Sequence, residues 1–212
     1  MTLHENKEAF SDAIRATSDY LGIREVFVEK DYWVTFILKR LSHSENKDKV
    51  VFKGGTSLSK VFGLIERFSE DVDLAIIKEA DQSKYKIGKL IKSIQEELTA
   101  GFREIATENT SQKKNFRKNE YEYDEILEAG VDVSANVLVP QSTMIEKILS
   151  IIRLSYFPDS IDRIKGKARH FYDIYFLATS EHCKEYISTK AFKDDFERMY
   201  LEDKTKFDTP ED

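Results

Sequence analysis

The sequence predicts an α+β fold, in which a small mixed β-sheet with flanking helices precedes a C-terminal helical half. Two observations predict it. Residues 50–77 read as a strand, a glycine turn, a helix and a second strand. After Pro140 the strand-like alternation stops, and apolar residues recur at helical spacing. We therefore expect an α/β core with N-terminal helices over residues 1–140 and a helical domain over residues 141–212.

The composition is that of a globular protein without a general attraction to polyanions. The 212 residues are 41% hydrophobic and 34% charged, which is enough to bury a core. The net charge of −6 means that a nucleic acid would have to be met by a local basic patch. A single cysteine excludes an intramolecular disulfide and a thiolate metal cluster. Because no signal peptide or membrane-spanning run is visible in the sequence, we expect a cytoplasmic protein with no membrane partner.

Two helices are predicted before the first strand. A capping-box pattern over residues 2–5 opens the first helix, and Gly22 ends it. Apolar side chains at helical spacing predict the second helix over residues 24–41. The first strand follows over residues 50–53, where the residues are apolar up to Lys53. It leads into the glycine turn and its helix.

The next region mixes strands, a helix and a loop. A second strand is predicted over residues 71–77, and Asp81 is the expected cap of a long amphipathic helix. Residues 107–118 are polar and basic, which is typical of a loop. Polar and apolar residues then alternate, so that two further strands are expected over residues 120–127 and 130–139.

Three helices are predicted after Pro140, over residues 141–156, 171–178 and 189–201. The middle helix is aromatic nearly all round, so we expect most of it to be buried. Asp173 lies within it, and a buried carboxylate needs a partner or a ligand. Two partners are open: Arg169, one turn earlier in the same helix, or Lys147 in the preceding helix.

Asp71 and Asp73 are the first candidate metal ligands. Because they are two residues apart on a predicted strand, their side chains point to the same face. Two close carboxylates repel each other unless a cation lies between them, and their oxygens suit Mg²⁺. Asp132 lies on the polar face of a later predicted strand and is a third candidate ligand. A solvent-exposed strand residue is an equally good interpretation of Asp132.

The glycine turn is a candidate phosphate site. Gly54 and Gly55 leave the backbone bare of side chains before a helix begins, and N–H groups there attract phosphate. The simpler alternative is a tight strand-to-helix turn without a ligand. Together with the two carboxylates, the turn predicts a site for a phosphate and a metal ion.

Four segments of the sequence carry a resemblance to one family. They are Glu-Lys-Asp-Tyr-Trp-Val over 29–34, Gly-Gly-Thr-Ser-Leu with Arg-Phe-Ser-Glu-Asp-Val-Asp-Leu over 54–74, Met-Ile-Glu-Lys-Ile-Leu over 144–149, and Arg-His-Phe-Tyr-Asp-Ile-Tyr over 169–175. In this order they resemble the AbiEii/AbiGii-type nucleotidyltransferases, which belong to the polymerase-β-like nucleotidyltransferase superfamily. The resemblance implies that the small sheet is a nucleotidyltransferase core.

The same resemblance implies a function. Members of the family are toxins of toxin–antitoxin and abortive-infection systems, and some transfer nucleotides to the 3′ acceptor end of tRNA. We therefore expect an enzyme that transfers NMP from an NTP and releases pyrophosphate. Its cofactor would be Mg²⁺ (or Mn²⁺), and its partners would be an NTP, a tRNA or other RNA acceptor and a cognate antitoxin protein.

Roles for particular residues follow from the resemblance. Asp71 and Asp73 would bind the metal, and Asp132 stands where the family often has Glu. Lys147 would place a cation against the triphosphate, and Asp173 would orient Lys147 or help to position the acceptor. Further phosphate contacts are expected from Gly54, Gly55, Thr56, Ser57 and Arg67.

Three alternatives remain open. The nucleotide could be transferred to a protein or a small molecule instead of RNA. The chain could also be a catalytically silent binding module of the same fold. A metal-dependent phosphatase or nuclease is the weakest alternative, because the four histidines show no metal-ligand spacing.

Overall fold

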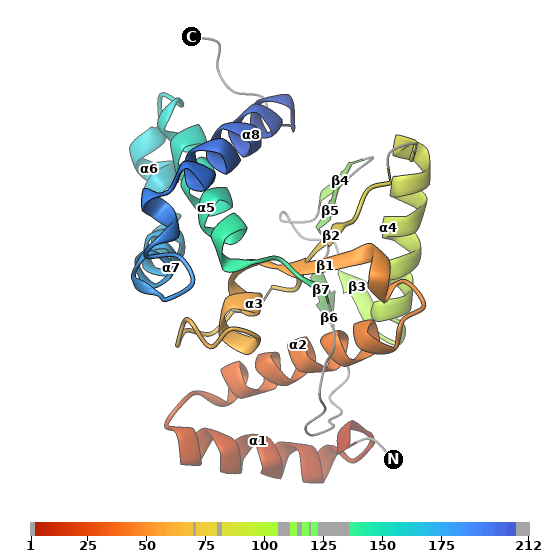
Figure 1. Ribbon diagram of the computed structural model, residues 1–212. Helices are drawn as coiled ribbons and strands as arrows, with labels where there is room; N and C mark the ends of the chain where they lie inside the picture. The colour runs from red at the N-terminus through yellow and green to blue at the C-terminus, as the bar shows by residue number, and fades with distance from the viewer. Residues whose placement is uncertain are drawn as a thin grey trace. The chain divides into compact units, whose positions relative to one another are not determined.

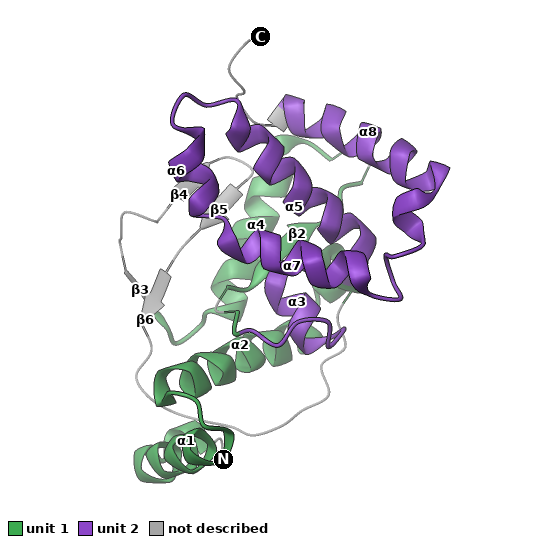
Figure 2. Cartoon of the chain, turned by 90° about the vertical axis from the view of Figure 1, so that its left-hand side faces the viewer, with its two compact units in different colours: residues 1–52, 68–136 green, residues 53–67, 137–212 purple. Residues whose placement is uncertain are grey.

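The computed structural model describes residues 3–69, 71–79, 82–105, 111–113, 116–118, 120–122 and 136–206, and it is drawn in Figure 1. The chain forms two compact units. The first comprises residues 1–52 and 68–136, and the second comprises residues 53–67 and 137–212 (Figure 2). The glycine turn therefore groups with the C-terminal helices. These two compact units need not coincide with independently folding domains, so the predicted domain boundary at residue 140 stays a prediction.

The helices of the first unit are α1 (Lys7–Leu21), α2 (Glu25–His43) and α4 (Lys84–Leu98), with short 3-10 turns η1 (Leu3–Glu5) and η2 (Lys47–Lys49). The predicted cap over residues 2–5 is wrong, because the Asn6 side chain accepts the hydrogen bond from the Ala9 N–H. The predicted end of α1 at Gly22 is confirmed, since Gly22 has a φ of 67°, a left-handed conformation that favours glycine. Ser83 caps α4 in place of the predicted Asp81, which lies outside the described residues.

A three-stranded mixed sheet has the strand order β2 (Asp73–Ile76), β1 (Val50–Lys53), β7 (Asn136–Val137). The bounds of β1 are those predicted from the sequence, whereas β2 is shorter than the predicted strand. Helices α2 and α4 share a core with β1, formed by the buried side chains of Leu41, Val50, Ile94 and Leu98. Apolar burial thus places the sheet beside these two helices and confirms the α+β class.

Two short antiparallel pairings lie between α4 and β7 in the sequence. Strand β3 (Arg103–Ile105) pairs with β6 (Glu120–Glu122), and β4 (Ser111–Lys113) pairs with β5 (Phe116–Lys118), with Ser111 opposite Lys118. The loop predicted over residues 107–118 is therefore wrong for β4 and β5. Their mostly polar sequences lack the apolar alternation by which a strand is recognised. Most of the strand predicted over residues 130–139 lies outside the described residues.

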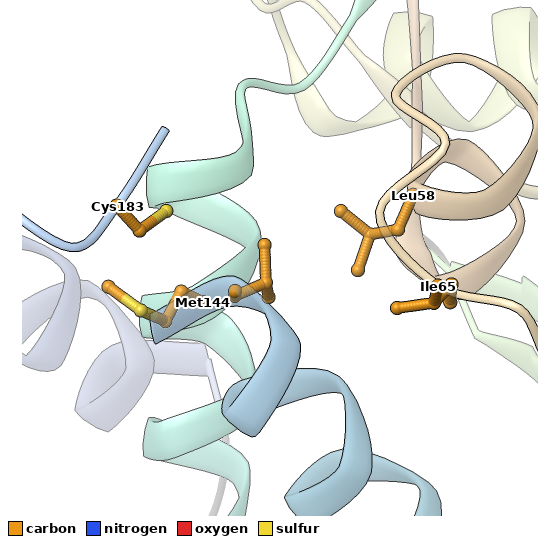
Figure 3. Packing of buried hydrophobic residues seen from close by; sticks show 5 residues of the cluster. Leu58, Ile65, Met144 and Cys183 are labelled. Carbon is orange, nitrogen blue, oxygen red and sulfur yellow. The ribbon is translucent and has the colours of Figure 1, made fainter. Parts of the chain in front are cut away.

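The second unit is mostly helical in its described residues. Its elements are α3 (Gly54–Lys60), α5 (Pro140–Ser155), α6 (Ser160–Lys165), α7 (Ala168–Thr179), η3 (Tyr186–Ser188) and α8 (Lys190–Lys206). Buried side chains from the segment after the glycine turn, from α5, from α7 and from the turn that follows α7 form one core: Leu58, Ile65, Met144, Leu177 and Cys183 (Figure 3). This core fixes the glycine-turn segment against the C-terminal helices.

The expectation that most of α7 is buried is wrong. Tyr175 is 64% exposed, and Phe171 and Tyr172 are also exposed on the same side of the helix. Asp173 and Leu177 point to the opposite side and are fully buried. A helix buries only the face that packs against its neighbours, whatever the residue types on its other face. Within the described residues, no helix combines the length and the apolar character that crossing a membrane requires.

The core of the second unit gives a first test. Leu58 is fully buried, and replacing it with alanine removes apolar contacts and leaves a cavity. We expect Leu58→Ala to lower the free energy of unfolding by about 2–5 kcal/mol. Leu201→Ala, at an exposed site on α8, is the control and should change it by less than about 0.5 kcal/mol. Urea unfolding followed by circular dichroism measures both, and equal effects would contradict the assigned core.

Candidate functional site

The buried carboxylate of Asp173 is bound by two cations. Arg67 donates from Nε to Oδ1 at 2.8 Å and from Nη2 to Oδ2 at 2.6 Å. The Nζ of Lys147 lies 2.8 Å from Oδ2. The structure therefore places Lys147, one of the two partners left open by the sequence, in contact with Asp173. All three residues belong to the second unit, and they are called the Asp173 cluster below.

Local structure explains how the three side chains meet. Arg67 follows Ile65, whose burial in the core anchors the end of the glycine-turn segment. Lys147 is one of the buried residues of α5, together with Met144 and Leu149, so its ammonium needs a partner. Asp173 lies on the inner face of α7, four residues before the core residue Leu177. Packing of the core thus brings the cluster together.

The Asp173 carboxylate keeps its charge inside the cluster. Burial alone would raise the pKa of Asp173, but hydrogen bonds from Arg67 and Lys147, with their charges, outweigh burial and hold that pKa below its usual 3.8. Asp173 is therefore ionised at neutral pH. Two cations thus hold one buried anion through charge-assisted hydrogen bonds.

His170 lies in the field of the same cations. Its pKa is lowered from 6.5 to about 4, first by burial and then by the charges of Lys147 and Lys167. The imidazole is consequently neutral at neutral pH and adds no charge to the cluster.

The glycine turn is built from buried residues. Gly54 has a φ of 81°, which favours glycine at this position. Gly55, Thr56 and Ser57 are buried at the start of α3, and the Ser57 hydroxyl donates to the Gly54 carbonyl at 2.9 Å. This hydroxyl is therefore engaged within the turn. The assignment of Gly54, Gly55, Thr56 and Ser57 to phosphate binding stays a prediction.

Asp71 and Asp73 belong to the first unit. Asp73 is the first residue of β2, and Asp71 precedes it by two residues. Both are exposed, and the half-buried Val72 separates them, as expected for two carboxylates on one face. This donor set fits Mg²⁺, which commonly takes one or two carboxylates and completes its shell with water and substrate phosphates. In the described part of the chain no group of three or more His, Cys, Asp or Glu forms a metal site. Asp132 lies outside that part.

One contact was missed by the sequence analysis. Arg67 was expected to bind phosphate, whereas the structure shows its guanidinium on Asp173. The two residues are 106 positions apart, so no helical or strand periodicity relates them. The sequence contained one signal of a second partner. The carboxylate of Asp173 was expected to be buried, and a carboxylate has two oxygens that each accept hydrogen bonds.

Comparisons with known proteins give one family. The model described as "Nucleotidyl transferase AbiEii toxin, Type IV TA system" matches residues 37–134 and residues 117–212. The matched ranges contain the glycine turn, both exposed carboxylates of the β2 segment and the Asp173 cluster. No curated protein and no solved structure gives a significant match.

The titration of His170 predicts a pH dependence of stability. The pKa of His170 is about 4 in the folded chain, whereas an unperturbed histidine, as in the unfolded chain, has a pKa of 6.5. As the pH falls, the unfolded chain therefore binds the proton first. The free energy of unfolding should therefore be highest above pH 6.5 and fall as the pH is lowered from 6.5 toward about 4. The contribution of Asp173, whose pKa lies below 3.8, is lost only at more acidic pH.

Urea unfolding over this pH range measures the decline. We expect His170→Gln to flatten the slope between pH 6.5 and about 4, because glutamine does not titrate. His43→Gln, at an exposed site on α2, should leave the slope unchanged. An identical slope in the wild type and His170→Gln would show that His170 is not the group responsible.

Proposed function

The chain belongs to the nucleotidyl transferase AbiEii toxin family of type IV toxin–antitoxin systems, and on this premise we propose that it transfers NMP from an NTP to an RNA acceptor. Membership implies a nucleotide substrate and an antitoxin partner. The choice of tRNA as acceptor is part of the proposal. The Asp173 cluster is the observation that supports it best, because it holds the Lys147 ammonium in the same unit as the glycine turn.

The proposed reaction is a displacement at the α-phosphorus. An acceptor hydroxyl attacks, a new P–O bond forms, and the bond to the bridging oxygen breaks as pyrophosphate leaves. The hydroxyl proton is released to solvent. Such a reaction needs positioning and charge neutralisation more than covalent help from the protein. Asp71 and Asp73 would hold Mg²⁺ or Mn²⁺, which when bound supplies charge neutralisation and activates the hydroxyl.

Lys147 is the proposed cation for the triphosphate. Its Nζ is 2.8 Å from Asp173, and its side chain is 9% exposed, so the ammonium is held in one place. A fixed ammonium stabilises developing phosphate charge without the cost of ordering a flexible side chain during the reaction. The burial of Asp173 supports the role of orienting Lys147 over the alternative of contacting the acceptor.

Arg67 is proposed to hold Asp173. The guanidinium donates two hydrogen bonds to the carboxylate in the planar geometry that arginine favours. With Arg67 in place, Asp173 stays ionised and keeps the Lys147 ammonium fixed.

A transfer assay tests the proposal. Labelled NTPs are incubated separately with total tRNA, with protein and with small-molecule acceptors. We expect label on tRNA, and a loss of about a hundredfold or more in rate for Lys147→Ala and for Asp71→Asn. Lys89→Ala, at an exposed lysine of α4, is the control and should keep the wild-type rate. Unchanged transfer by both site variants would contradict the mechanism. Label found only on protein would show that the acceptor is a protein and not RNA.

Metal removal gives a separate test. We expect EDTA to abolish transfer, and added Mg²⁺ or Mn²⁺ to restore it, because the metal would supply the charge neutralisation that the reaction needs. Asp73→Asn should raise the Mg²⁺ concentration for half-maximal rate by at least about tenfold. A transfer rate that is insensitive to EDTA would remove the metal from the mechanism.

A further inference from the structure

A second ion pair lies beside the Asp173 cluster and joins the glycine turn to α5. Lys53 is the last residue of β1 and directly precedes Gly54. Its Nζ lies 2.7 Å from Oε1 and 2.9 Å from Oε2 of Glu146, so the ammonium contacts both oxygens of the carboxylate. Both residues belong to the second unit.

Glu146 is the neighbour of Lys147 on α5. The two consecutive residues contact different segments: Glu146 contacts the strand end before the glycine turn, and Lys147 contacts α7 through Asp173. Successive residues of a helix point about 100° apart, so one rigid turn of α5 serves both contacts. The separation between the glycine turn and the Lys147 ammonium is therefore set by this turn of α5.

The Lys53–Glu146 pair is too exposed to be explained by stability. The two side chains are 29% and 37% exposed, and exposed pairs contribute little to the free energy of folding. The hydrophobic core already fixes α3 and α5 in the same unit. What the pair adds is a fixed end for β1 at the point where the chain enters a left-handed glycine.

We propose that Lys53 and Glu146 are positioning residues, which hold the glycine turn and Lys147 at the separation that one triphosphate requires. This inference rests on the proposed function, since it assumes that both elements bind the same NTP. Neither residue contacts the reacting atoms. Loss of the pair should weaken nucleotide binding, because a shift of about 1 Å between two binding groups is enough to cost affinity and rate.

The test uses the full chain and measures the Kd for NTP by calorimetry together with KM and kcat. We expect Glu146→Gln and Lys53→Met each to raise Kd and KM by roughly tenfold, with a smaller change in kcat. The double variant K53E/E146K restores the pair with its charges exchanged and should recover most of the lost affinity. Single variants with wild-type Kd and KM, or a double variant no better than the singles, would overturn the inference.

Arg153 and Asp203 provide the matched control. This pair also involves α5, at its other end, and both side chains are 19% exposed. Asp203→Asn should lower the melting temperature at least as much as Glu146→Gln and leave Kd and KM unchanged. An equal rise in KM would mean that any loosening of α5 suffices, which would also overturn the inference.

The outcome for the wild type separates this inference from the proposed function. If the wild type binds NTP without transferring label to any acceptor, the proposed function fails, and the Kd comparison still decides the role of the pair. If the wild type binds no NTP, both are overturned.

Discussion

The second unit depends on one buried charge, the carboxylate of Asp173. A buried ion needs good pairing geometry, and here Arg67 and Lys147 supply it at 2.6–2.8 Å. These cations come from the glycine-turn segment and from α5, so the carboxylate on α7 joins three parts of the fold. Removing one partner of such a pair typically costs about 3–5 kcal/mol, because the remaining charge stays buried. The cluster therefore constrains the fold as strongly as the apolar core beside it.

Stability alone does not explain why a cluster of this kind is present. Apolar side chains of similar volume usually stabilise a protein as well as a buried ion pair does, or better. The Asp173 cluster also fixes the Lys147 ammonium in one position, which an apolar replacement would not provide. A fixed ammonium is suited to charge-assisted hydrogen bonds with an anionic ligand. In the proposed function, that ligand is the nucleotide that family membership indicates as substrate.

Local patterns predicted the elements that local physics determines. The bounds of β1 and the left-handed end of α1 at Gly22 follow from apolar runs and glycine conformation, and both are confirmed. Tertiary contacts decide the rest. The pairing of Arg67 with Asp173 spans 106 positions, and the exposed side of α7 depends on which face its neighbours cover. Polar strands such as β4 carry no apolar alternation. The family, by contrast, was predictable, because four ordered motifs are more specific than any single one.

The electrostatics of the second unit suit a site whose charge does not change near neutral pH. His170 is neutral there because its pKa is about 4, and Asp173 is ionised because its cationic partners hold its pKa below 3.8. Neither group gains or loses a proton at physiological pH. Affinity for a triphosphate would then be governed by geometry, namely by where Lys147 and the glycine turn stand. Geometry of this kind must be maintained by fixed contacts. Beside the apolar core, the ion pair of Lys53 with Glu146 is one such contact between the start of the glycine turn and α5.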